Sequence, residues 1–183
     1  MTTSQYESRS HSFRPVFAIG LLTLALLAGC STDGGAPSDA PRGDSTQSTS
    51  NESSGATMPK VTGATTEAPT ISAPTGNPPA DLVIEDISLG TGVAAGANST
   101  LTVHYTLMAW STGEIVESSW VAQPATFGLN QVIQGWQQGI PGMKEGGRRL
   151  LVIPPALGYG EAGGGPIGPN ETLIFVVDLI KVS

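Results

Sequence analysis

The feature that most constrains the fold is the uneven distribution of large apolar and aromatic side chains along the 183 residues. All three tryptophans lie after residue 80, whereas residues 31–79 contain no aromatic residue. In that stretch, 39 of 49 residues are Ser, Thr, Gly, Pro, Ala, Asn or Gln. Such a segment buries too little surface to offset about 1–2 kcal/mol of backbone entropy per residue. We therefore expect one folded domain over residues 80–183, preceded by a disordered tether over residues 30–79 that is dispensable for its stability.

Charge and cysteine content exclude several classes of protein. The formal net charge is −7, from 8 Lys and Arg against 15 Asp and Glu, whereas phosphate binding needs a basic surface. The single Cys excludes an intrachain disulfide and a Cys-based metal cluster, and the two histidines, His11 and His104, lie too far apart to form a metal site alone. No P-loop, dinucleotide-binding, nucleophile-elbow or metalloprotease signature is present. We therefore expect no nucleic-acid partner, no metal and no cofactor.

The first thirty residues have the pattern of an export signal. Arg9 and Arg14 precede a twelve-residue apolar run, Val16 to Leu27, which is too short to span a bilayer but typical of a signal-peptide core. The junction Leu27-Ala28-Gly29-Cys30 resembles the cleavage site of bacterial lipoproteins. This resemblance implies a signal peptide over residues 1–29, lipid on the Cys30 thiol, and a place on the extracytoplasmic face of the cell membrane. The alternative is ordinary secretory cleavage, or a short anchor, with Cys30 incidental.

Apolar periodicity in the last hundred residues predicts an α+β domain. Alternating apolar and polar residues predict strands, and one segment has helical spacing. The predicted strands cover residues 81–89, 100–110, 114–118, 125–129, 148–153 and 172–182, and the helix covers residues 132–140. Residues 157–169 hold six Gly and two Pro and are predicted to be a loop. Because no βαβ unit is present, we expect an antiparallel sheet covered on one face by a short helix.

Six segments of this domain form a recognisable series. They are Val103-His104-Tyr105-Thr106, Glu117-Ser118-Ser119-Trp120, Val132-Ile133-Gln134-Gly135-Trp136, Gly142-Met143-Lys144-Glu145-Gly146, Ile153-Pro154-Pro155-Ala156-Leu157-Gly158-Tyr159-Gly160 and Leu173-Ile174-Phe175-Val176-Val177-Asp178-Leu179. In this order they resemble the FKBP family, which are peptidyl-prolyl cis-trans isomerases that bind macrolides. The resemblance implies a five-stranded, half-conical antiparallel sheet wrapped around one short helix.

The resemblance also implies a set of site residues. Those implied for catalysis are Tyr105, Trp136, Tyr159 and Phe175, and those implied for substrate binding are Val116, Glu117, Val132, Ile133 and Ile167. The proline ring would sit on the Trp136 indole, and the Ile133 N–H and the Tyr159 hydroxyl would each donate to a substrate carbonyl. The simpler interpretation of the aromatic residues is that they are ordinary core.

Several residues depart from the family pattern. Val116-Glu117 stands where the family has Phe-Asp, and Ala125 stands at a position that is usually aromatic. We therefore expect a site with less aromatic surface, unless Trp120 fills the space beside Val116. Arg148, Arg149 and Glu145 are expected at the solvated surface.

Three functions of different classes are compatible with this sequence. The first is a membrane-anchored, extracytoplasmic prolyl isomerase that acts on proline-containing exported polypeptides and also binds macrolides. The second is a non-catalytic peptide-binding or chaperone module on the same fold, and a purely structural lipoprotein is a third alternative. Trp136, Tyr159 and Phe175 favour catalysis, whereas Val116 and Ala125 favour a binding module.

Overall fold

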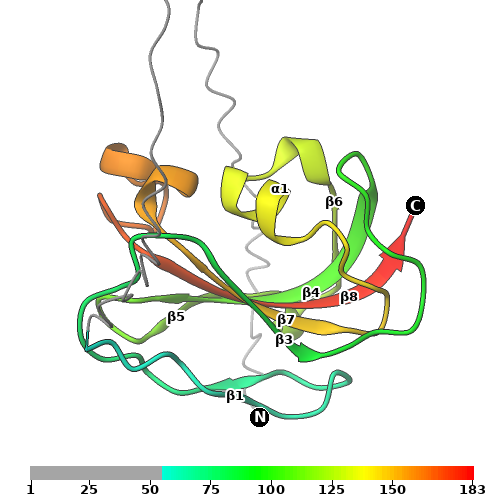
Figure 1. The fold of residues 1–183 in the computed structure, drawn as a ribbon, viewed down its shortest axis with the longest axis horizontal. Coiled ribbons are helices and arrows are strands. Elements are labelled where there is room, and N and C mark those ends of the chain that lie inside the picture. The colour runs from blue at the N-terminus through cyan, green and yellow to red at the C-terminus, as the bar shows by residue number, and fades with distance from the viewer. Residues whose placement is uncertain (1–54) are drawn as a thin grey trace, which may run out of the picture. The chain divides into compact units, whose positions relative to one another are not determined.

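The computed structural model describes residues 55–183 (Figure 1). The predicted signal peptide, the lipidation site Cys30 and the predicted tether up to residue 54 lie outside the described residues. The main sheet consists of β3 (Val83–Ser88), β4 (Thr100–Ala109), β5 (Ile115–Ser118), β6 (Ala125–Gly128), β7 (Arg148–Ile153) and β8 (Leu173–Val182), and a separate hairpin pairs β1 (Val61–Thr62) with β2 (Thr70–Ile71). Within residues 55–183 the α-helix is α1 (Gln134–Gly139), and 3₁₀ turns occupy Ser119–Val121, Leu129–Gln131, Pro155–Leu157 and Gly160–Ala162. The predicted antiparallel sheet with one short helix is confirmed.

The sheet has six strands, which agrees with the six segments predicted from periodicity, so the count of five implied by the resemblance is wrong. The strand order is β3-β7-β8-β4-β5, with β6 also paired to β4, and every pair is antiparallel. β6 pairs with residues 100–103 of β4, and β5 pairs with residues 106–108. The two short strands therefore follow each other along the same edge of β4.

The two faces of the sheet are set by alternation along β4. Leu101, Val103 and Leu107 pack with α1 on what we call the inner face, whereas Met108 packs on the opposite, outer face. β7 is buried at every residue because it lies inside the sheet and both of its faces are covered. Its apolar run therefore shows no alternation.

Two glycines allow α1 to lie close to β7. A Cβ atom on Gly139 would come within 2.7 Å of Leu151 Cδ2, and one on Gly135 would overlap the Ile153 side chain. Larger residues at these positions would push the helix away from the sheet. Close approach of α1 buries its single tryptophan, Trp136, against the inner face. No helix in the described part of the chain is long and apolar enough to cross a membrane.

Residues 55–79, which we call the strap, are folded against the outer face of the sheet, on the side opposite α1 (Figure 1). The strap carries the β1–β2 hairpin, and its apolar side chains pack against Met108, Trp110, Leu150, Val152, Ile174 and Val176. Three prolines of the strap, Pro59, Pro69 and Pro74, are buried. The prediction of a disordered tether is therefore wrong for residues 55–79.

Hydrogen bonds fix the strap at both ends of its hairpin. The Arg148 guanidinium donates to the carbonyl oxygens of Gly63 (Nη1, 3.0 Å) and Glu67 (Nη2, 2.7 Å), and Trp110 Nε1 donates to the carbonyl of Gly76 at 3.1 Å. Low apolar content predicted disorder on the assumption that the segment must form its own core, and the strap needs none. It uses apolar surface that the sheet supplies, and its prolines lower the entropy lost on ordering.

Candidate active site

Four aromatic side chains meet on the inner face and form what we call the aromatic cluster. Trp136 lies at its centre, on α1, and contacts Tyr105 from β4, Phe127 from β6 and Phe175 from β8. The ring centroids of these three lie 6.0, 6.0 and 5.3 Å from the indole, with interplanar angles of 83°, 89° and 88°. Such perpendicular contacts are the favoured geometry for aromatic pairs. The three rings thus stand as walls around the indole.

The predicted apolar site residues all converge on this cluster. Trp136 is 4% exposed and Phe175 5%, whereas Tyr105 and Phe127 are only partly buried. The remaining predicted residues that pack in the same inner core are Val116, Val132, Ile133, Tyr159 and Ile167. The sequence therefore identified side chains that the fold does bring together, although they come from five separate segments.

A hydrogen bond links Tyr105 to Glu117 at the edge of the cluster. The Tyr105 hydroxyl donates to Glu117 Oε1 at 2.6 Å, because β4 and β5 pair with Leu107 opposite Glu117. Burial raises the pKa of Tyr105, and the hydrogen bond and the negative charge of Glu117 raise it further. The phenol therefore stays protonated at physiological pH and remains a donor.

Tyr159 lies on the loop that follows β7 and packs against the same core. Burial raises its pKa, and the negative charge of Glu117 raises it further. Gly164 makes room for the ring, because a Cβ atom there would come within 2.9 Å of Tyr159 Cδ1. Reciprocal backbone hydrogen bonds of 2.9 Å between Gly164 and Ile167 hold this loop closed beside the ring.

Two donors at this site have no acceptor among residues 55–183. The backbone N–H of Ile133 makes no hydrogen bond there, although its carbonyl accepts from the Trp136 and Gln137 N–H groups at the start of α1. The hydroxyl of Tyr159 likewise donates to no described residue. A bound molecule with carbonyl oxygens can satisfy both groups.

Phe127 is the site residue that the sequence analysis missed. The family pattern drew attention to Ala125 alone on this strand. Phe127 lies two residues further on and faces the same side of β6, and the two residues pair with Val103 and Leu101 respectively. The period of two along a strand was the signal that identifies it. The cluster thus keeps an aromatic wall that the sequence analysis counted as lost.

Trp120 does not take part in the aromatic cluster. Its ring stacks on His104, with centroids 4.0 Å apart and planes 16° apart. His104 precedes Tyr105 on β4 and so points to the outer face. Trp120 therefore does not supply the missing aromatic surface beside Val116.

The two arginines predicted at the solvated surface are buried instead. Arg148 makes a bidentate ion pair with Asp178 (2.6 and 3.0 Å), and Arg149 makes one with Asp86 (2.7 and 2.9 Å). Arg149 also donates to the Gly139 carbonyl at 2.7 Å, at the end of α1. Both side chains hold elements of the fold together.

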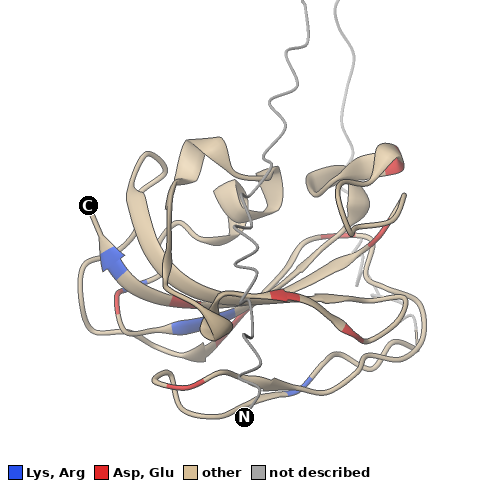
Figure 2. Cartoon of the chain, turned by 180° about the vertical axis from the view of Figure 1, so that it is seen from behind, with Lys and Arg blue, Asp and Glu red and all other residues tan. Residues whose placement is uncertain are grey.

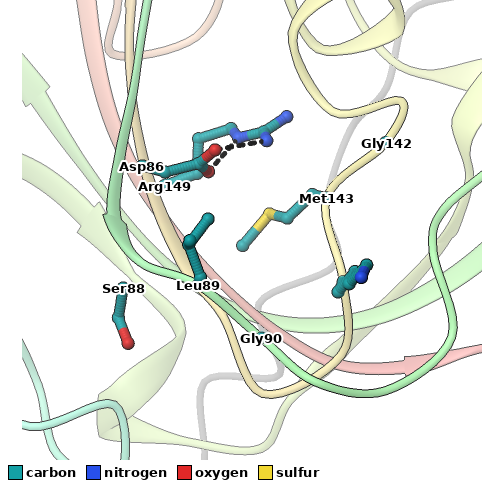
Figure 3. Close-up of a pocket in the computed structure, with 8 residues that line it drawn as sticks. Asp86, Ser88, Leu89, Gly90, Gly142, Met143 and Arg149 are labelled. Atoms are coloured by element: carbon teal, nitrogen blue, oxygen red, sulfur yellow. Dashed lines mark hydrogen bonds and ion pairs between the residues drawn. The ribbon is translucent and has the colours of Figure 1, made fainter.

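A cavity of about 120 Å³ lies away from the aromatic cluster (Figure 3). It is lined by Asp86, Ser88, Leu89, Gly90, Gly142, Met143, Lys144 and Arg149. Its Asp86 and Arg149 side chains bind each other, so neither offers a free reactive group. Residues 55–183 contain no cluster of His, Cys, Asp or Glu suited to a metal ion. The aromatic cluster, with its two unpaired donors, is the better candidate site.

The sequence of this domain is similar to those of known proteins. Residues 92–180 match the family described as FKBP-type peptidyl-prolyl cis-trans isomerase. The FK506-binding protein of Streptomyces anulatus is 54% identical over 121 residues, which cover 63% of this chain and 98% of that protein. The probable FK506-binding protein of Corynebacterium glutamicum is 49% identical over 116 residues, with the same two coverages.

Solved structures show the same fold. FkpA from Escherichia coli superposes with a TM-score of 0.53 at 39% identity, over 56% of this chain and 48% of that chain. A peptidyl-prolyl cis-trans isomerase from Pseudomonas syringae superposes with a TM-score of 0.52 at 35% identity, over 56% of this chain and 75% of that one.

Proposed function

The chain belongs to the FKBP-type peptidyl-prolyl cis-trans isomerase family, and we propose that it isomerises prolyl bonds of exported polypeptides while lipid on Cys30 holds it at a membrane. The observation that carries the catalytic part is the aromatic cluster with two unpaired donors beside it. The membrane part rests on the sequence of the first thirty residues alone.

The chemistry of the reaction suits an apolar surface. Rotation about the prolyl amide is opposed by a barrier of about 18–20 kcal/mol. In the twisted transition state the amide loses its resonance and with it the charge separation that water stabilises. A proline ring packed on Trp136, with Tyr105 and Phe175 beside it, leaves the amide in an environment that favours the twisted form over the planar one.

The two unpaired donors would orient the peptide across the twisted bond. We assign the Ile133 N–H and the Tyr159 hydroxyl to carbonyl oxygens of the substrate, while Val132, Val116 and Ile167 supply apolar contact around the ring. No covalent bond is made or broken in this reaction, so neither a nucleophile nor a cofactor is needed. The relatives are named for binding FK506, and we propose that this chain binds such macrolides at the same cluster.

Two tryptophans provide a matched test of the catalytic proposal. Trp136→Phe should lower kcat/KM on a proline-containing tetrapeptide by roughly tenfold or more, because about 1.4 kcal/mol of transition-state contact is worth that factor. Trp120→Phe should leave kcat/KM unchanged, since that ring stacks on His104 on the other face. Equal effects of the two substitutions would overturn the assignment of the cluster as the active site.

The membrane proposal has its own experiment. Each buried acyl CH₂ contributes about 0.8 kcal/mol, so two or more chains on Cys30 give stable anchoring. Wild-type protein should sediment with membranes after cell lysis, and Cys30→Ser should appear unprocessed or in the supernatant. Wild-type protein found wholly in the supernatant would contradict the lipid anchor.

A further inference from the structure

The charges around the aromatic cluster are of one sign. Residues 101–143 and 150–180 contain no Lys or Arg, although Glu114, Glu117, Glu161 and Glu171 lie within them. Figure 2 shows acidic residues in the β5 region and in the 3₁₀ turns after β7, whereas basic residues lie in β7, near the end of β8 and in the strap. The segments that supply the aromatic cluster therefore carry no Lys or Arg, and one of their carboxylates, Glu117, contacts the cluster through Tyr105.

None of the five basic residues of the described chain can neutralise this acidity. Arg148 and Arg149 are buried and already paired with Asp178 and Asp86. Lys60 lies in the strap, on the other face of the sheet. Lys181 pairs with Thr102 near the start of β4, and Gly146, two residues after Lys144, donates to the Leu179 carbonyl on the same part of β8. Glu117 instead pairs with Leu107, near the other end of β4.

Glu117 is the acidic residue that reaches the site itself. Its Oε1 accepts the hydrogen bond from Tyr105 at 2.6 Å, and its charge acts on Tyr159 as well. Its Oε2 has no hydrogen-bond partner among residues 55–183, and the residue is exposed. One carboxylate oxygen is thus fixed by an aromatic wall of the site, and the other is open to a ligand.

We propose that Glu117 makes this isomerase select prolyl bonds flanked by a basic residue and discriminate against those flanked by an acidic one. This inference rests on the proposed function. The residues on either side of the proline are bonded to the ring that packs on the cluster, and Glu117 is hydrogen-bonded to Tyr105 in the wall of that cluster. We therefore place the side chain at one of these two positions beside the Glu117 carboxylate. A Lys or Arg there gains a charge-assisted contact, and an Asp or Glu is repelled.

The expected selectivity is modest because Glu117 is exposed. An exposed ion pair changes kcat/KM by roughly 1.4- to 5-fold, and repulsion by a similar factor, so the ratio between Lys and Glu peptides should be about 2- to 25-fold. Salt should reduce this ratio, since exposed charges are screened.

The test uses the full chain in detergent and proline tetrapeptides that carry Lys, Gln or Glu before the proline or after it. Wild-type protein should process the Lys peptide fastest and the Glu peptide slowest in at least one of the two series. Glu117→Gln keeps an acceptor for the Tyr105 hydroxyl but removes the charge, so the Lys-to-Glu ratio should fall close to one. The control Glu85→Gln removes an exposed carboxylate from β3 and should leave the ratio unchanged.

The outcomes separate the two proposals. A chain that accelerates the Gln peptides but shows no Lys preference at either position overturns the role of Glu117 alone. A preference that survives Glu117→Gln overturns it as well. A chain that does not accelerate the Gln peptides overturns the proposed function and this inference with it.

Discussion

The two faces of the sheet are built from the same strands but differ in how completely they are covered and hydrogen-bonded. On the outer face, the strap covers the apolar side chains, and Arg148 and Trp110 donate hydrogen bonds to strap carbonyls. On the inner face, α1 covers only part of the surface, and the Ile133 N–H and the Tyr159 hydroxyl are left without acceptors in the described chain. The donors of Arg148 and Trp110 are satisfied on the outer face, which stabilises the fold, whereas the two unpaired donors lie on the inner face, where we propose that the substrate binds.

The strongest test of this difference is Arg148→Met on the outer face. The Arg148 side chain is fully buried and its partner Asp178 nearly so, and removing one partner of a buried ion pair costs about 3–5 kcal/mol. Urea denaturation should show this loss, whereas isomerase activity per folded molecule should stay at the wild-type value. Lys181→Met, at an exposed position on the same strand as Asp178, serves as the control. A loss below about 1 kcal/mol would mean that the pair does not hold the outer face together.

Removal of the strap should also destabilise the domain without abolishing activity. A chain that begins at residue 80 exposes several large apolar side chains, each of which is worth about 1.5–3 kcal/mol when fully buried. We expect a net loss of at least about 2 kcal/mol, or roughly 10 °C in Tm for a domain of this size. The control is a chain that begins at residue 55. Equal Tm values for the two chains would show that the strap contributes nothing.

Tyr159→Phe tests the inner face, where we expect a loss of activity without a loss of stability. The substitution removes one hydroxyl donor, so kcat/KM should fall by roughly 2- to 13-fold, from about 0.5–1.5 kcal/mol. Stability should change little, because the hydroxyl makes no hydrogen bond to residues 55–183. An unchanged kcat/KM together with a lower Tm would place Tyr159 among the structural residues.

Val116→Phe should raise the activity and the macrolide affinity of the inner face. Trp120 stacks on His104 on the other side of the sheet, whereas Val116 packs against the inner core, so a ring at position 116 should add apolar contact to the cluster. About 40 Å² of added apolar contact is worth about 1 kcal/mol, or roughly 5-fold in kcat/KM and in macrolide affinity. A rate that falls or stays level would show that Phe127 already limits this space.

Regular elements of the domain could be predicted from the sequence with good accuracy, because alternation and helical spacing are local signals. The single helix and each strand of the main sheet lie within two residues of the predicted bounds at either end. The partners of each strand are not local, which is why β5 and β6 were not recognised as sharing one edge of β4.

The site was predictable as a set of residues but not as a geometry. The resemblance supplied Trp136, Tyr105, Tyr159 and Phe175, yet it gave no reason to look at Phe127. Composition alone failed for the strap, since its order depends on contacts with residues more than 80 positions away. A polar segment can be folded when another part of the chain offers it an apolar surface.

The position of the strap in the chain affects the order in which parts of the domain can fold during synthesis. The surface that it covers is built by β4, β7 and β8, and Arg148 follows Gly63 by 85 residues. At a synthesis rate of about 5–20 residues per second, Arg148 is added to the chain roughly 4–17 s after Gly63. Of the outer-face residues that the strap covers, only Met108 and Trp110 precede Arg148, so during that interval Met58, Val61 and Ile71 lack most of their docking surface. We therefore expect the strap to dock only after the sheet has formed, so a segment that is made before the sheet is ordered after it.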